Sequence, residues 1–113
     1  MNVLVIEPMR KPYAKEIDGE LESMQNIVDG LIQAVYPFED EAVALICNEE
    51  GKLLGLPLNR ALRDENGEIY DIIAGTFLIC SAPLDSENFA GLSDEQIQEY
   101  KRKFEHIEIY LRR

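Results

Sequence analysis

The chain has 113 residues, of which 46% are hydrophobic, and its formal net charge is −11. This length fits one domain, so we expect residues 1–113 to form a single domain, and the hydrophobic content argues against disorder. The negative charge argues against binding to nucleic acid or to anionic membranes, because their phosphate groups would repel it. No apolar run reaches the roughly 18 residues that a membrane span needs. Glu7 and Pro8 interrupt the apolar start too early for a signal peptide, so we expect a cytoplasmic protein.

Short strands and one helix are predicted in the first part of the chain. The β-branched run 2–7 predicts a strand, and the alternating segment 13–18 predicts a second strand that pairs back on it as a hairpin. Apolar residues recur at three- and four-residue spacing over 20–29, which predicts a helix. Residues 31–38 and 42–48 are predicted strands. The second has no polar alternation, which indicates a strand covered on both faces.

The middle of the chain is predicted to continue the sheet. After a glycine turn, residues 52–58 are expected to return as the partner strand of 42–48. Residues 59–67 are expected to form a short helical turn or a loop. Residues 68–80 are strand-like, and Gly75 near their middle predicts a bulge or break.

The clearest predicted helix covers residues 93–107, where Ser93 and Gln96 match a capping box. The whole pattern predicts an α+β fold with a mainly antiparallel sheet of about five to seven strands and two main helices, about 20–29 and 93–107. The runs without polar alternation are the expected central strands: 3–6, 43–47 and 76–80.

The chain closely resembles a bacterial family, catalogued as domain of unknown function 3846, over two long segments: VLVIEPMRKPYAKEIDGELESMQNIVDG and AVYPFEDEAVALICNEEGKLLGLPLNRALRDENGEIYDIIAGTFLIC. The resemblance covers nearly all of residues 2–105. It implies a small bacterial accessory domain, of a kind often found in phage-like or mobile-element-like regions near anti-restriction genes. It carries over no catalytic residue.

The sequence contains no recognisable set of catalytic residues. The single histidine, His106, has no visible partner that would make it a general base. Cys47 and Cys80 each end an apolar run, so we expect reduced, buried thiols rather than a disulfide or a metal framework. We therefore expect no metal, no cofactor and no enzymatic activity.

The segment LPLNRALR places two arginines among leucines, and two interpretations stay open. In the structural one, Arg60 is partly buried and pairs with an acid. The candidate partners are Asp64, Glu65, Asp71 or an acid remote in sequence. In the other, the segment forms a small anion- or carboxylate-binding site. Its candidate residues are Asn59, Arg60, Arg63 and Tyr70.

Acidic turns flank the predicted strand 42–48, and they suggest a surface for a basic partner. The candidate surface residues are Glu39, Asp40, Glu41, Glu49 and Glu50. The leading expectation is therefore a non-catalytic protein-interaction domain with a protein partner, in the setting of a phage or mobile element. The sequence also leaves a homodimer open.

Overall fold

A computed structural model describes residues 1–39 and 41–110 of the chain. In chain order the elements are β1 (Asn2–Ile6), β2 (Tyr13–Glu16), α1 (Leu21–Val28), β3 (Ile32–Val35), β4 (Val43–Asn48), β5 (Leu58–Arg63), β6 (Ile69–Ala74), β7 (Phe77–Ser81) and α2 (Asp94–Phe104). The predicted α+β class, with mainly antiparallel strands and two helices, is confirmed.

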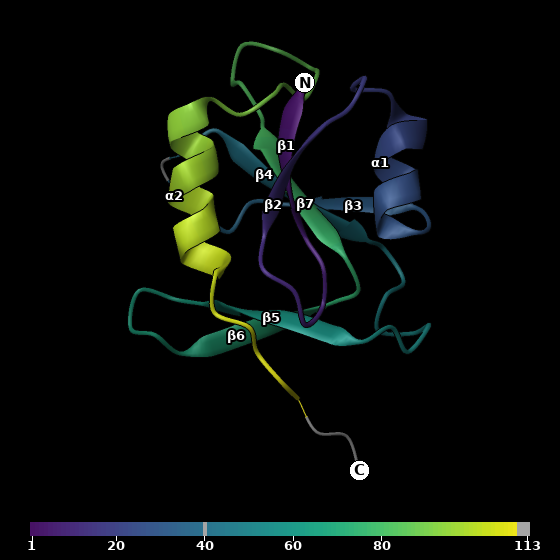
Figure 1. The fold of residues 1–113 in the computed structure, drawn as a ribbon, viewed down its shortest axis with the longest axis vertical. Helices are drawn as coiled ribbons and strands as arrows, with labels where there is room; N and C mark the ends of the chain where they lie inside the picture. Colours follow the sequence, from purple (N-terminus) through teal and green to yellow (C-terminus); the bar gives the residue numbers. More distant parts are fainter. Residues whose placement is uncertain (40, 111–113) are drawn as a thin grey trace.

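The strands form two sheets, and every pairing is antiparallel (Figure 1). The larger sheet has five strands in the order β2-β1-β7-β4-β3, and β5 and β6 form a separate two-stranded sheet. The three runs expected at the centre are β1, β4 and β7, and β2 and β3 are the edges. The prediction of the central strands is therefore confirmed.

Both faces of the larger sheet are covered, which explains why its central strands lack polar alternation. Successive side chains of a strand point to opposite faces. In β1, Val3 and Val5 pack in the cluster that contains Met24 of α1, whereas Leu4 and Ile6 pack in the cluster on the opposite face. The cluster that contains Leu4 and Ile6 is covered by α2 and by the β5–β6 hairpin. Figure 1 accordingly shows α1 and α2 on opposite sides of the sheet.

The predicted β1–β2 hairpin is confirmed, and so are both helices, with slightly shorter bounds than expected. The capping box of α2 is present, because Ser93 and Gln96 exchange side-chain-to-backbone hydrogen bonds. The break at Gly75 is also present. Its φ is 83°, its N–H donates to the carbonyl of Pro57 at 2.7 Å, and a Cβ atom there would lie 2.8 Å from Leu56 Cδ1.

The expected strand over 52–58 is wrong. The chain turns through this segment, and the neighbours of β4 are β3 and β7. A close backbone contact fixes the turn, since a Cβ atom at Gly51 would lie 2.7 Å from the carbonyl oxygen of Ala74. The apolar pair Leu53 and Leu54 consequently stays exposed rather than entering the sheet.

The expected helical turn or loop over 59–67 is wrong for its first half, because strand β5 (Leu58–Arg63) runs there and pairs with β6. The rest is the hairpin turn. Asp64 Oδ1 closes this turn by accepting hydrogen bonds from the backbone N–H groups of Asn66 and Glu68, both at 2.9 Å. The four-residue spacing of Leu58 and Leu62 favours a helix locally, but pairing with β6 makes this segment a strand.

No helix within the two described ranges is long and apolar enough to cross a membrane.

Candidate functional site

Arg60 is an internal side chain, with only 1% of its surface exposed. Its Nε donates to the carbonyl of Phe104 at 3.1 Å, one terminal nitrogen donates to Asn59 Oδ1 at 2.8 Å, and the other donates to the carbonyl of Arg10 at 2.7 Å. The predicted pairing with an acid is therefore wrong, because the guanidinium bonds carbonyl groups and an amide. Burial lowers the pKa of Arg60, and the nearby charge of Glu108 opposes that shift.

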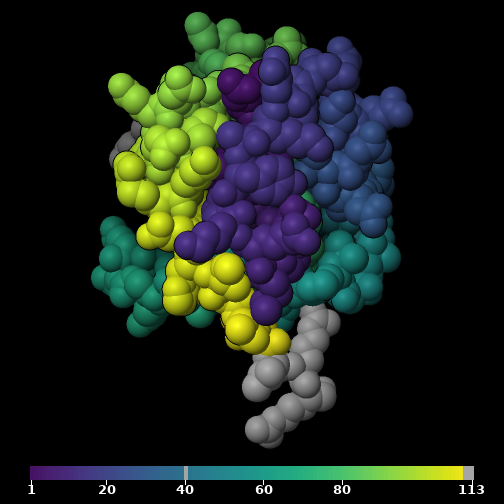
Figure 2. Space-filling model, viewed as in Figure 1, coloured from purple at the N-terminus to yellow at the C-terminus, as the bar shows by residue number. Residues whose placement is uncertain are grey.

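Asn59 is fully buried beside Arg60 and continues the same network. Its Nδ2 donates to the carbonyls of Ile6 and Gly75, each at 2.9 Å. The pair therefore joins β1, β5, the turn before β7 and the end of α2. In Figure 2 the yellow segment after α2 lies against the purple β1–β2 segment. The arrangement favours the structural interpretation of Asn59 and Arg60, since neither side chain is open to a ligand.

Arg63 is exposed at the end of β5, in contrast to the buried Arg60 of the same strand. Its guanidinium pairs with Glu108 at 3.0 Å. Glu108 also accepts hydrogen bonds from the N–H of Ala61 at 3.0 Å and from the Tyr110 hydroxyl at 2.7 Å. Burial alone would raise the pKa of Glu108, but hydrogen bonds from Tyr110, Arg63 and Ala61 lower it. These contacts of Glu108 hold the segment after α2 against β5.

A groove follows the tip of the β5–β6 hairpin, where it faces the loop between β3 and β4. It consists of two adjoining depressions of about 440 and 490 Å³. Both are lined by Pro37, Glu39, Arg63, Asp64, Glu65 and Tyr70. We call this region, together with Tyr36, Phe38, Glu41 and Lys103 at its walls, the hairpin groove. It joins two predicted ligand residues, Arg63 and Tyr70, to two residues of the predicted acidic surface, Glu39 and Glu41.

Carboxylates outnumber cations in the hairpin groove. It has four acids, Glu39, Glu41, Asp64 and Glu65, and two bases, Arg63 and Lys103. Arg63 is already paired with Glu108, and Glu41 accepts a hydrogen bond from the Tyr100 hydroxyl. Within the described residues, the side chains of Glu39 and Glu65 have no hydrogen bond or ion pair, and both are exposed to solvent.

Aromatic rings form part of the same groove. Tyr36 is 61% exposed and Tyr70 is 57% exposed. The Phe38 ring lies deeper, with its centroid 4.9 Å from that of Tyr100 and 6.0 Å from that of Phe104. Lys103 Nζ lies 4.9 Å from the Phe38 centroid and 5.2 Å from the Tyr100 centroid, within the range of a cation–π contact.

The predicted acidic surface is divided by strand β4. Glu39 and Glu41 belong to the hairpin groove, whereas Glu49 and Glu50 follow the opposite end of β4. Asp40 lies outside the described residues. Glu49 and Glu50 line a separate cavity of about 160 Å³.

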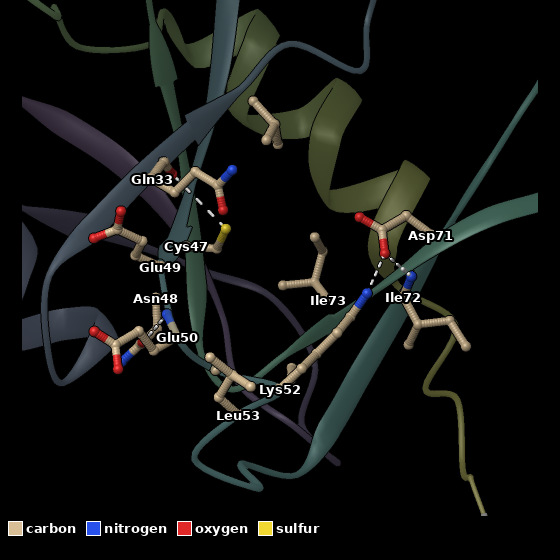
Figure 3. A pocket seen from close by; sticks show the side chains of 13 residues that line it. Gln33, Cys47, Asn48, Glu49, Glu50, Lys52, Leu53, Asp71, Ile72 and Ile73 are labelled. Atoms are coloured by element: carbon tan, nitrogen blue, oxygen red, sulfur yellow. Dashed lines mark hydrogen bonds and ion pairs between the residues drawn. The ribbon is translucent and has the colours of Figure 1, made fainter.

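Figure 3 shows the acids of this smaller cavity on its two sides. Glu49 and Glu50 lie on the β4 side, and Asp71 of β6 lies across from them, paired with Lys52. The Cys47 thiol donates to the carbonyl of Gln33 at 3.7 Å. In the part of the chain that the structure describes, no group of three His, Cys, Asp or Glu residues could hold a metal ion.

The fold is an α+β arrangement in which a five-stranded antiparallel sheet carries one helix on each face and a hairpin beside the second helix. The chain belongs to the family described as domain of unknown function DUF3846, whose model matches residues 1–105. The resemblance noted from the sequence is thus confirmed. No curated protein and no solved structure matches the chain.

The sequence-based predictions did not include several residues that line the groove, among them Tyr36, Phe38 and Lys103. A signal was present in the run YPFEDE, where two aromatic residues flank a proline and precede three acids. Exposed aromatic residues beside charges are typical of binding surfaces. Lys103 had no such signal, because it meets Phe38 only after α2 has packed on the sheet.

Proposed function

We propose that this protein is a non-catalytic, cytoplasmic interaction domain that binds a protein partner through the hairpin groove. One observation carries the proposal. Four carboxylates and exposed tyrosine rings from separate parts of the chain gather in one concave surface. In the mobile-element setting that the family resemblance implies, the partner would be a basic host protein.

The two kinds of side chain contribute differently to such an interface. Tyrosine rings bury large areas on binding while their hydroxyl groups stay hydrated, so Tyr36 and Tyr70 would supply contact area. The carboxylates attract a basic surface and accelerate its encounter, an effect that salt weakens. Glu39 and Glu65 are suited to this role because neither forms an ion pair among the described residues.

The proposal predicts that the two ends of β4 differ in function. Changing Glu39 and Glu65 to glutamine should reduce recovery of the partner about three- to tenfold at low salt, because steering charges at the contact surface are lost. Changing Glu49 and Glu50 to glutamine removes the same total charge from the other end and should alter recovery less than about twofold. The measurement is co-purification from a cell lysate over a series of salt concentrations, with quantitative mass spectrometry.

Equal losses in the two double variants would mean that net charge rather than the hairpin groove attracts the partner. Unchanged recovery in the Glu39 and Glu65 variant, with the same salt dependence as the wild type, would refute the groove as the contact surface. Both variants should keep the wild-type melting temperature, because the four side chains are exposed.

A further inference from the structure

Lys103 already places a cation on an aromatic surface at the wall of the hairpin groove. Its side chain is exposed at the last turn of α2, yet its ammonium lies over both Phe38 and Tyr100. No ion pair holds it there among the described residues. The attraction between the positive charge and the electron-rich ring faces is therefore the contact that places the ammonium on this wall.

The aromatic surface beneath Lys103 is firmly built. Tyr100 is fully buried, Phe104 is 6% exposed, and the Phe38 ring packs against both. The Tyr100 hydroxyl is held by Glu41, which fixes that ring relative to the loop between β3 and β4. A cation that replaced Lys103 would meet the same ordered rings, with no need to reorganise the protein. Such preorganisation favours binding because little side-chain freedom is lost.

The surroundings suit a guanidinium better than an ammonium. A guanidinium is planar, stacks on aromatic faces and can pair with a carboxylate through two parallel hydrogen bonds. The hairpin groove offers exposed rings from Tyr36 and Tyr70, and carboxylates from Glu39 and Glu65 that form no ion pair with any described residue. Its excess of acids over bases also selects a positively charged ligand.

We propose that the hairpin groove binds an arginine-bearing, extended segment of the partner protein, and that one arginine displaces Lys103 from the Phe38 and Tyr100 rings. This inference rests on the proposed function of the groove as a partner surface. An extended segment fits because the two depressions adjoin along the hairpin tip, so that successive side chains would meet the rings and the carboxylates in turn. Lys103 then acts as a built-in competitor for the arginine.

The experiment uses a nonapeptide of alternating arginine and glycine as the probe, with the same peptide carrying citrulline as the uncharged isostere. Binding is measured by calorimetry at low salt, and the contact surface is mapped by amide chemical shifts of the labelled protein. We expect the arginine peptide to bind at least about tenfold more tightly than the citrulline peptide. We expect the shifts to concentrate around Phe38, Glu65 and Tyr70.

Lys103→Gln tests the competition directly, and Arg102→Gln is its matched control. Both remove one positive charge from the exposed side of α2, but Arg102 does not line the groove. Lys103→Gln should tighten binding of the arginine peptide about two- to fivefold relative to Arg102→Gln, the change expected when an exposed cation–π competitor is removed. Melting temperatures of the two variants should match, which separates the effect from folding.

Three results would overturn the inference. They are equal affinity for the arginine and citrulline peptides, shifts centred on Glu49 and Glu50 instead of the groove, and equal affinities of the Lys103 and Arg102 variants. A lysine peptide that binds as tightly as the arginine peptide would overturn the assignment to arginine. The proposed function fails on a different result, namely that the Glu39 and Glu65 double variant recovers the partner as well as the wild type does.

Discussion

Replacing Arg60 by methionine should lower the free energy of unfolding by about 3–5 kcal/mol, because three buried acceptors would each lose a hydrogen bond from a charged group. Methionine keeps much of the apolar stem but has no donor. The carbonyls of Phe104 and Arg10 and the side-chain oxygen of Asn59 would each lose a hydrogen bond inside the protein. Since domains of this kind are stable by only about 5–15 kcal/mol, urea denaturation should show a clearly lowered midpoint.

Arg63→Met is the matched control, because it removes the same group from the same strand. The Arg63 side chain is 46% exposed, and without it Glu108 would keep its hydrogen bonds from Ala61 and Tyr110, so the loss should cost only about 1 kcal/mol. Arg60→Lys should restore little of the lost stability, since one ammonium cannot reproduce the planar, three-way donation of a guanidinium. Equal losses for Arg60→Met and Arg63→Met would contradict the role of Arg60 as an internal tie.

The central strands could be predicted from the sequence, whereas β5 could not, and the reason lies in its pairing with β6. The register shifts between Leu58 and Arg60 and again between Leu62 and Arg63. These irregularities bury four consecutive residues, 59–62, so the alternation by which a strand is recognised is lost. The remaining four-residue spacing of Leu58 and Leu62 resembles that of a helix.

The role of Arg60 was hidden from the sequence for a different reason. Acids are visible in a sequence and were therefore considered as its partners, but every residue has a backbone carbonyl that can accept a hydrogen bond. Arg10 and Phe104 lie 50 and 44 positions away from Arg60 and have side chains unrelated to that role. The prediction that Arg60 is an internal strut agrees with its burial, and only the fold could supply its partners.

The Cys80 thiol should react with a maleimide reagent at least about a thousandfold more slowly in the native protein than in urea. Cys80 is fully buried on the central strand β7, and burial raises its pKa to about 12. The reactive species is the thiolate, so labelling requires an opening that both exposes and ionises the sulfur. If that opening is global unfolding, a stability of about 5 kcal/mol or more gives this degree of protection.

Single-thiol variants make the measurement specific, with Cys47→Ala leaving Cys80 and Cys80→Ala leaving Cys47. Cys47 should label faster, because it is 5% exposed and lines the small cavity beside the edge strand β3, which can fray locally. A raised native pKa means that the thiol favours the folded state fully below about pH 8.5 and that this contribution is lost as the pH rises toward 12. Protection of Cys80 should therefore weaken in alkali. Native labelling of Cys80 as fast as that of Cys47 would show that β7 opens locally between β1 and β4, contrary to its place at the centre of the sheet.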